Sequence, residues 1–115
     1  MTQREAQSLH VKLFAQMILY AYAHGYELTW GQALRTTLEA QANAATGKGI
    51  SNSLHLIGLA VDVNLFLNGV WLQNTADHAP LGAFWKSLHP LCRWGGDFVS
   101  RPDGNHYSIE WNGVK

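Results

Sequence analysis

The residues best suited to chemistry are a histidine and an aspartate, His55 and Asp62, in the stretch 53–62. Apolar residues flank Asp62 on both sides and predict a buried strand over 59–67. A lone ionised carboxylate on such a strand is costly unless it is paired or bound to a metal ion. Neutral imidazole nitrogen and carboxylate oxygen are both good ligands for zinc. The pair therefore indicates part of a zinc site.

A catalytic zinc ion has three protein ligands and one open coordination position, so a further ligand must come from elsewhere in the chain. His106 is the best candidate for it. A turn at Gly104-Asn105 would bring the carboxylate of Asp103 close to the open position. Asp97 competes with Asp103 for the role of catalytic base, but it lies farther from His106 along the chain. We therefore expect Asp103 to be the base.

The composition predicts one domain over 1–115, because 47% hydrophobic residues suffice for a core in a chain of 115 residues. Eight basic and eight acidic residues leave no net charge. This balance argues against nucleic acid as a partner and against long-range attraction to anionic lipid. The single cysteine, Cys92, excludes an internal disulfide and a four-cysteine zinc site, and we expect it to be a buried free thiol.

No stretch of the sequence reaches the roughly 18 apolar residues of a membrane span. Residues 11–23 end in Ala-x-Ala, like a secretory cleavage site, but Lys12 and Gln16 interrupt their apolar run. We therefore expect a monomeric domain without a signal peptide and without membrane insertion.

Apolar periodicity places the remaining elements along the chain. Thr2 and Glu5 form a capping box ahead of a helix that Gly25 ends. Asn68-Gly69 is a strong hairpin signal after the strand over 59–67. The other expected elements are strands at 26–30, 70–72 and 105–111 and a helix at 80–88. His10 and His24 are expected at the surface or the edge of the core. Residues 74–79, which include Asp77 and His78, are expected to form a solvated loop.

Two motifs together resemble the zinc peptidases that cut cell-wall peptides containing D-amino acids. This family comprises D-Ala-D-Ala carboxypeptidases and dipeptidases, and the L-alanyl-D-glutamate endopeptidases of phage lysis enzymes. The resemblance covers roughly residues 26 to 111. Its first motif is Ser-x-His-x-x-Gly-x-Ala-x-Asp, and its second is an acid three residues before the last ligand. The matching positions are Ser53, His55, Gly58, Ala60 and Asp62, followed by Asp103 and His106.

The resemblance implies an α+β fold: a small antiparallel sheet with helices packed mainly on one face and a Zn²⁺ site on the sheet. It implies that His55, Asp62 and His106 hold the ion and that Asp103 is the base. Arg35, in the segment Arg35-Thr36, would donate to a substrate oxygen, as the rigid guanidinium fork allows. A surface arginine in a salt bridge is the alternative for this position. Many relatives carry a glutamate two residues after the last ligand, where this chain has Ser108, so Glu110 is a candidate partner of the His106 ring.

The implied substrate is the stem peptide of peptidoglycan, cut by metal-activated water between L-Ala and D-Glu. Trp94-Gly95-Gly96 is similar to a segment of the phage enzymes, with Trp94 expected to wall the pocket. A phage or prophage endolysin would stay in the host cytoplasm until released and act in the periplasm on the cell wall. Two alternatives remain open: a D-Ala-D-Ala carboxypeptidase, and an inactive zinc-containing module that binds wall peptides. A serine or cysteine hydrolase is disfavoured, since no Gly-x-Ser-x-Gly motif occurs and Cys92 has no evident partner.

Overall fold

A long amphipathic helix, α1 (Gln3–Ala23), opens the chain. Its first turn is closed by the expected capping box: Thr2 Oγ1 accepts from the Glu5 main-chain N–H at 3.1 Å, and the Thr2 main-chain N–H donates to Glu5 Oε1 at 2.8 Å. Gly25, at φ +83°, takes the left-handed conformation that lets the chain turn back from the helix. This is a computed structural model, and it describes residues 1–31 and 54–115.

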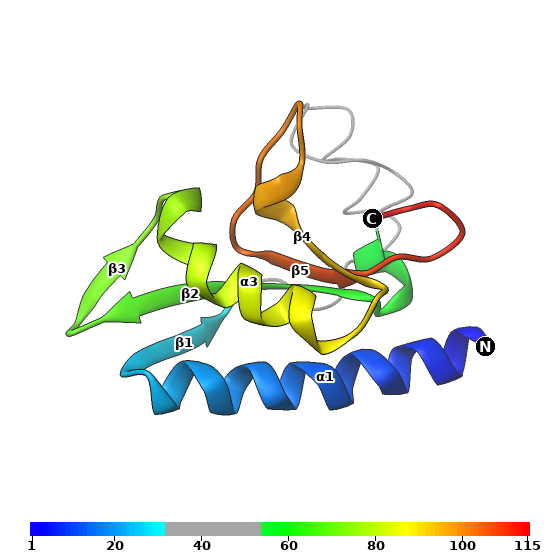
Figure 1. Ribbon diagram of the computed structural model, residues 1–115, viewed down its shortest axis with the longest axis horizontal. Helices are drawn as coiled ribbons and strands as arrows, with labels where there is room; N and C mark the ends of the chain where they lie inside the picture. Colours follow the sequence, from blue (N-terminus) through cyan, green and yellow to red (C-terminus); the bar gives the residue numbers. More distant parts are fainter. Residues whose placement is uncertain (32–53) are drawn as a thin grey trace.

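The described strands form one antiparallel sheet beside the helices (Figure 1). The strands are β1 (Tyr26–Trp30), β2 (Ala60–Leu67), β3 (Val70–Leu72), β4 (Cys92–Trp94) and β5 (His106–Ile109). Their order is β1-β2-β5-β4, and β3 also pairs with β2. Leu65 of β2 has Leu28 of β1 on one side and Leu72 of β3 on the other. β3 and β5 therefore share the edge of β2 that faces away from β1.

The two faces of the sheet differ because side chains alternate along each strand. Val61, Val63 and Leu65 of β2, with Tyr107 and Ile109 of β5, are buried in the hydrophobic core. That core includes one face of α1 and residues of α3 (Ala79–Leu88). Alternate residues, among them Asp62 and His106, lie on the other face. The expected α+β fold is confirmed, with the described helices α1 and α3 on one face of a small antiparallel sheet.

The hairpin between β2 and β3 turns at the expected residues. Asn68 has φ 52° and Gly69 has φ 78°. A type I′ turn requires two successive left-handed residues, and Asn-Gly is the pair that adopts them most readily.

Three short helical turns connect the main elements, namely η1 (Leu54–Ile57), η2 (Thr75–His78) and η3 (Gly95–Asp97). The expectation of a solvated loop over 74–79 is wrong at its end, because His78 is only 3% exposed and its Nδ1 lies 2.8 Å from the Tyr107 hydroxyl. His10 is also buried, with Nε2 3.1 Å from the main-chain oxygen of Tyr107. The strand β4 was not expected. None of the described helices is long and apolar enough to cross a membrane.

Candidate metal centre

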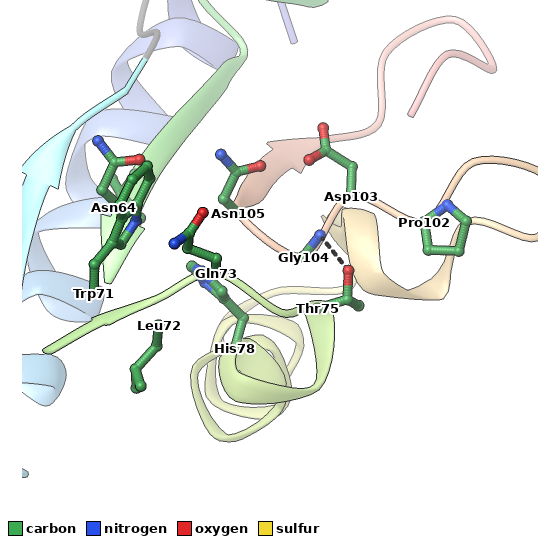
Figure 2. Close-up of a pocket in the computed structure, with 11 residues that line it drawn as sticks. Asn64, Trp71, Leu72, Gln73, Thr75, His78, Pro102, Asp103, Gly104 and Asn105 are labelled. Atoms are coloured by element: carbon green, nitrogen blue, oxygen red, sulfur yellow. Dashed lines mark hydrogen bonds between the residues drawn. The ribbon is translucent and has the colours of Figure 1, made fainter. Parts of the chain in front are cut away.

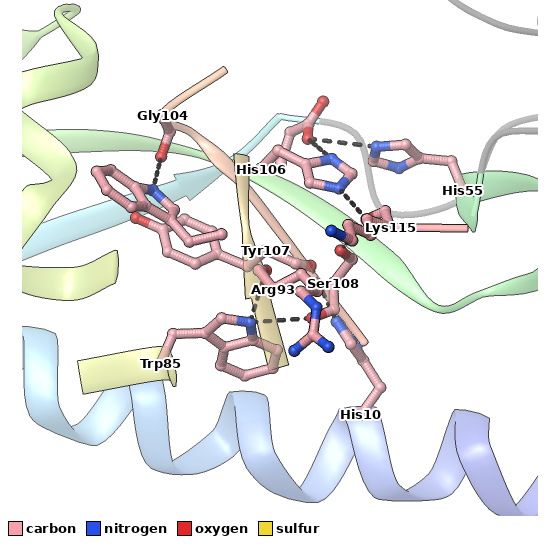
Figure 3. A network of polar contacts seen from close by, with 11 residues as sticks. His10, His55, Trp85, Arg93, Gly104, His106, Tyr107, Ser108 and Lys115 are labelled. Carbon is pink, nitrogen blue, oxygen red and sulfur yellow. Dashed lines mark hydrogen bonds and ion pairs between the residues drawn. The ribbon is translucent and has the colours of Figure 1, made fainter. Parts of the chain in front are cut away.

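Three side chains from three separate elements converge on the face of the sheet that points away from the helices (Figure 3). His55 comes from η1, Asp62 from β2 and His106 from β5. Asp62 and His106 are direct partners in the pairing of β2 with β5, so the sheet itself brings them together. Ligand-capable atoms of all three lie within 4.8 Å of one another. The structure thus brings together the three residues that the sequence singled out as a zinc set.

The spacing of these atoms fits one small tetrahedral ion. Asp62 Oδ1 lies 3.3 Å from His55 Nε2 and 3.4 Å from His106 Nδ1. Two ligands at about 2.0–2.1 Å from a tetrahedral zinc ion stand about 3.3–3.4 Å apart, because the edge of a tetrahedron is about 1.6 times its centre-to-corner distance. Both histidines are buried, and the Asp62 side chain is 17% exposed. Donor types, burial and spacing all suit zinc.

The carboxylate of Asp62 is held in its charged, ligand-competent form. Burial alone would raise its pKa, but the adjacent rings of His106 and His55 outweigh the burial and lower the pKa to about 2. Asp62 is therefore ionised throughout the neutral range, and binding a cation would not require it to lose a proton.

The ring of His106 is oriented by the end of the described chain. Its Nε2 donates to the main-chain oxygen of Lys115 at 3.2 Å, which leaves Nδ1 facing Asp62 as the atom with a lone pair. Ser108 donates its hydroxyl to the same oxygen. The prediction that Glu110 supports His106 is wrong, because Glu110 pairs with Arg93 through contacts of 2.9 and 3.0 Å. A main-chain oxygen carries no signature in the sequence, so this support could not be read from it.

The turn that carries His55 is tied to the first helix. Gln7 of α1 donates from Nε2 to the main-chain oxygen of Ile57 at 2.6 Å. Gly58, at φ +69°, then redirects the chain into β2. This explains why a glycine stands between the two ligands His55 and Asp62.

Asp103 lies in a turn that is held by main-chain hydrogen bonds. Its main-chain N–H donates to Gly95 at 2.9 Å, and its main-chain oxygen accepts from His106 at 3.1 Å. The side chain of Asp103 is exposed and borders a cleft of about 290 Å³ (Figure 2), which also takes in Val63 and Asn105, the chain neighbours of Asp62 and His106. We call this cavity the amide cleft. Its polar lining is made by Asn64, Gln73, Thr75, His78, Asp103 and Asn105, and Trp71 forms part of its wall.

From the sequence, Trp94 was expected to form a wall of the pocket. In the structure it supports the Asp103 turn. The indole is 8% exposed, and its Nε1 donates to the main-chain oxygen of Gly104 at 2.7 Å. A Cβ at Gly82 or Gly96 would come within 2.3 Å of the indole ring, so both glycines make room for it. At Gly95 a Cβ would fall 2.0 Å from the Asp103 main-chain oxygen. The Trp-Gly-Gly segment therefore packs against the Asp103 turn and supports it.

The other candidate base, Asp97, is engaged elsewhere. Its carboxylate lies 2.8 Å from Lys86 Nζ, and both side chains are largely solvent-exposed. Cys92 is a buried free thiol, as expected, and burial raises its pKa to about 11. The predicted Arg35 and the motif residue Ser53 lie outside the described residues.

The sequence of residues 46–109 matches the family model described as D-alanyl-D-alanine carboxypeptidase. The chain belongs to this family. It is a peptidoglycan peptidase of the metallopeptidase type, and the matched stretch contains His55, Asp62, Asp103 and His106. Among curated proteins, none matches the sequence significantly.

The fold is also similar to a solved structure, the L-Ala D-Glu endopeptidase ChiX of Serratia marcescens. The TM-score is 0.75 at 21% sequence identity, over 87% of this chain and 77% of that one. At this sequence identity, the similarity shows that the two proteins share a fold.

Proposed function

We propose that this protein is a zinc-dependent endopeptidase that hydrolyses the L-Ala–D-Glu bond of the peptidoglycan stem peptide. The observation that carries the proposal is the set of three ligand-capable atoms gathered at one point of the sheet. The exposed Asp103 is joined to this set through its main-chain oxygen, which accepts from the His106 N–H. The three ligands that the described residues supply leave one coordination position for solvent or substrate, which is the arrangement of catalytic and not structural zinc sites.

The described residues divide the work of amide hydrolysis between them. His55, Asp62 and His106 would hold the ion, which when bound supplies Lewis acidity and lowers the pKa of water to about 7. Asp103 takes the proton from the attacking water and delivers it to the leaving amine. Its side chain is exposed and lines the cleft, so that solvent and a bound peptide can both reach it. Arg35 is assigned to the developing oxyanion by the family pattern alone.

The choice of bond rests on the fold of a relative that is titled an L-Ala D-Glu endopeptidase. A D-Ala-D-Ala carboxypeptidase is the second candidate, because the matching family model carries that description. Mass spectrometry of digested, purified peptidoglycan distinguishes the two activities. Muramyl fragments ending in L-Ala support the endopeptidase, whereas release of single D-Ala residues would support the carboxypeptidase. We further propose a phage or prophage lysis role, with the protein held in the host cytoplasm until release into the periplasm.

Replacement of Asp103 tests the mechanism and the alternative of an inactive binding module. Asp103→Asn should lower kcat by about 10²- to 10⁴-fold, the usual contribution of a general acid–base group. Its zinc content should not change, since Asp103 is outside the three-ligand group. Asp97→Asn is the matched control, because it removes an acid that is paired with Lys86, and it should leave kcat within about twofold of wild type. If Asp103→Asn had the same kcat as the wild type, Asp103 would not be the catalytic base.

A further inference from the structure

The amide cleft lies where the sheet is interrupted. β5 pairs with the start of β2, up to Asp62, and β3 pairs with its end, from Leu65. Both partners use the same edge of β2, so Val63 and Asn64 lie between them, and both line the cleft. The cavity therefore begins immediately beyond the metal ligand Asp62 along the same strand.

A row of side chains leads from the metal centre across this gap. Asn64 and Phe66 share the face of Asp62, because alternate residues of a strand point the same way. Trp71 is the direct partner of Phe66, and their rings stack at 6.4 Å with an interplanar angle of 23°. At about 3.3 Å per residue, the row from Asp62 to Phe66 spans about 13 Å. This length exceeds one amino-acid residue and leaves room for a further group of the substrate.

The described lining of the cleft is polar, and its one basic side chain is the buried His78, whose pKa is lowered by burial. Figure 2 shows the side chains of Gln73 and Asn105 between Trp71 and the carboxylate of Asp103, with Asn64 drawn at the Trp71 side. Asn64 is oriented by Thr29, whose Oγ1 accepts from Asn64 Nδ2 at 3.2 Å. The indole of Trp71 is 51% exposed. Among the described lining residues there is no lysine or arginine, and Asp103 is the only acid.

The substrate is asymmetric about the L-Ala–D-Glu bond. On the D-Glu side it carries carboxylates, which are disfavoured by a cleft whose described lining holds one carboxylate, one buried histidine and no lysine or arginine. On the L-Ala side it carries the lactyl group and the N-acetylated sugar, which offer hydroxyl and amide groups without charge. Carboxamides can donate to and accept from such groups, and an exposed indole face can cover a sugar ring.

We propose that the amide cleft binds the N-acetylmuramyl sugar on the L-Ala side of the scissile bond, with Trp71 and Asn64 as its main contacts. This inference rests on the proposed function, because it identifies which end of the substrate lies along β2. The protein would accordingly prefer stem peptides that are still attached to the glycan.

The test compares two substrates of the zinc-loaded protein, a muramyl stem peptide and the same peptide with an N-acetyl cap in place of the muramyl group. The cap keeps the L-Ala nitrogen uncharged in both. We expect kcat/KM to be at least about tenfold higher for the muramyl peptide, the effect of one or two net hydrogen bonds or ring contacts. Trp71→Ala should reduce this ratio to below about threefold. Val70→Ala, at the 60%-exposed neighbour on the other face of β3, should preserve it.

A wild-type ratio near one would overturn the proposal. So would a Trp71→Ala variant that slows both substrates equally, since the cleft would then bind peptide and not sugar. Hydrolysis of neither substrate would refute the proposed function instead. In that case, the indole resonance of Trp71 during titration with N-acetylmuramyl-L-alanine still tests the cleft: a shift that saturates supports it, and an unmoved resonance overturns it.

Discussion

Trp94 offers a test of how the Asp103 turn is positioned, because Trp85 provides the same chemistry in another place. Each indole is buried and donates its N–H to main-chain oxygens. Trp94 donates to Gly104, next to Asp103, whereas Trp85 donates to Arg93 and Ser108 from the helix side of the sheet. Replacing either by phenylalanine removes the N–H and part of the ring but keeps an aromatic side chain.

Both variants should be destabilised. A lost hydrogen bond together with a buried carbonyl left without its donor costs about 1–3 kcal/mol, and the smaller ring adds to this through a cavity. A loss of about 2–4 kcal/mol corresponds to a fall in Tm of about 8–16 °C for a chain of this length, at about 4 °C per kcal/mol. The loss at Trp85 should be at least as large as at Trp94, because Trp85 has two acceptors at 3.0 Å and is fully buried.

Only Trp94→Phe should also impair catalysis. Displacing a catalytic group by about 1 Å can cost up to about 10²-fold, so we expect kcat to fall by about tenfold or more with zinc content unchanged. The assay is kcat on a stem peptide, at a temperature where urea or thermal curves show both variants folded. If Trp94→Phe retained the same kcat as Trp85→Phe, the indole would be a structural residue and its role in positioning Asp103 would be refuted.

Two further predictions concern the metal and pH. Zinc at about 100 times its Kd should stabilise the protein by about 2.7 kcal/mol, or about 11 °C in Tm, and His55→Ala should abolish this shift while the exposed His24→Ala retains it. If zinc still raised the Tm of His55→Ala, His55 would not be a zinc ligand. Burial lowers the pKa of His10 and of His78 below 6.5, so the unfolded chain binds protons there before the folded one, and metal-free protein should lose stability as pH falls below about 6.5. The urea concentration at the unfolding midpoint should fall as pH is lowered from 7.5 to 5, and it should fall less in His78→Gln than in the wild type. An equal fall in both proteins would contradict this.

The parts of the fold that the sequence predicted are those specified by local signals. The capping box at Thr2 and the apolar periodicity after it define α1. Asn68-Gly69 defines the hairpin. The alternation along β5 places His106 and Ser108 on one face, and both donate to the same main-chain oxygen. Each of these signals acts within a few residues and needs no knowledge of the rest of the chain.

The parts that were missed depend on partners far away in the sequence. β4 is three residues long and exists through its pairing with β5, so it has no periodicity of its own. His10 and His78 are buried because both contact Tyr107, which is 97 residues from the first and 29 from the second. Trp94 has its role through glycines on two other elements. Tertiary contacts of this kind leave no pattern in a single sequence.

The strand β2 carries two tasks in succession. Its first half, at Asp62, pairs with β5. Its second half forms the β2–β3 hairpin, and among the described strands β1 is the one that joins this hairpin to the rest of the sheet. Exposed residues of the hairpin, such as Val70 and Trp71, can therefore be exchanged without disturbing the strand pair that aligns Asp62 with His106. Substrate recognition by the hairpin can therefore change between relatives while the metal ligands at the start of β2 stay the same.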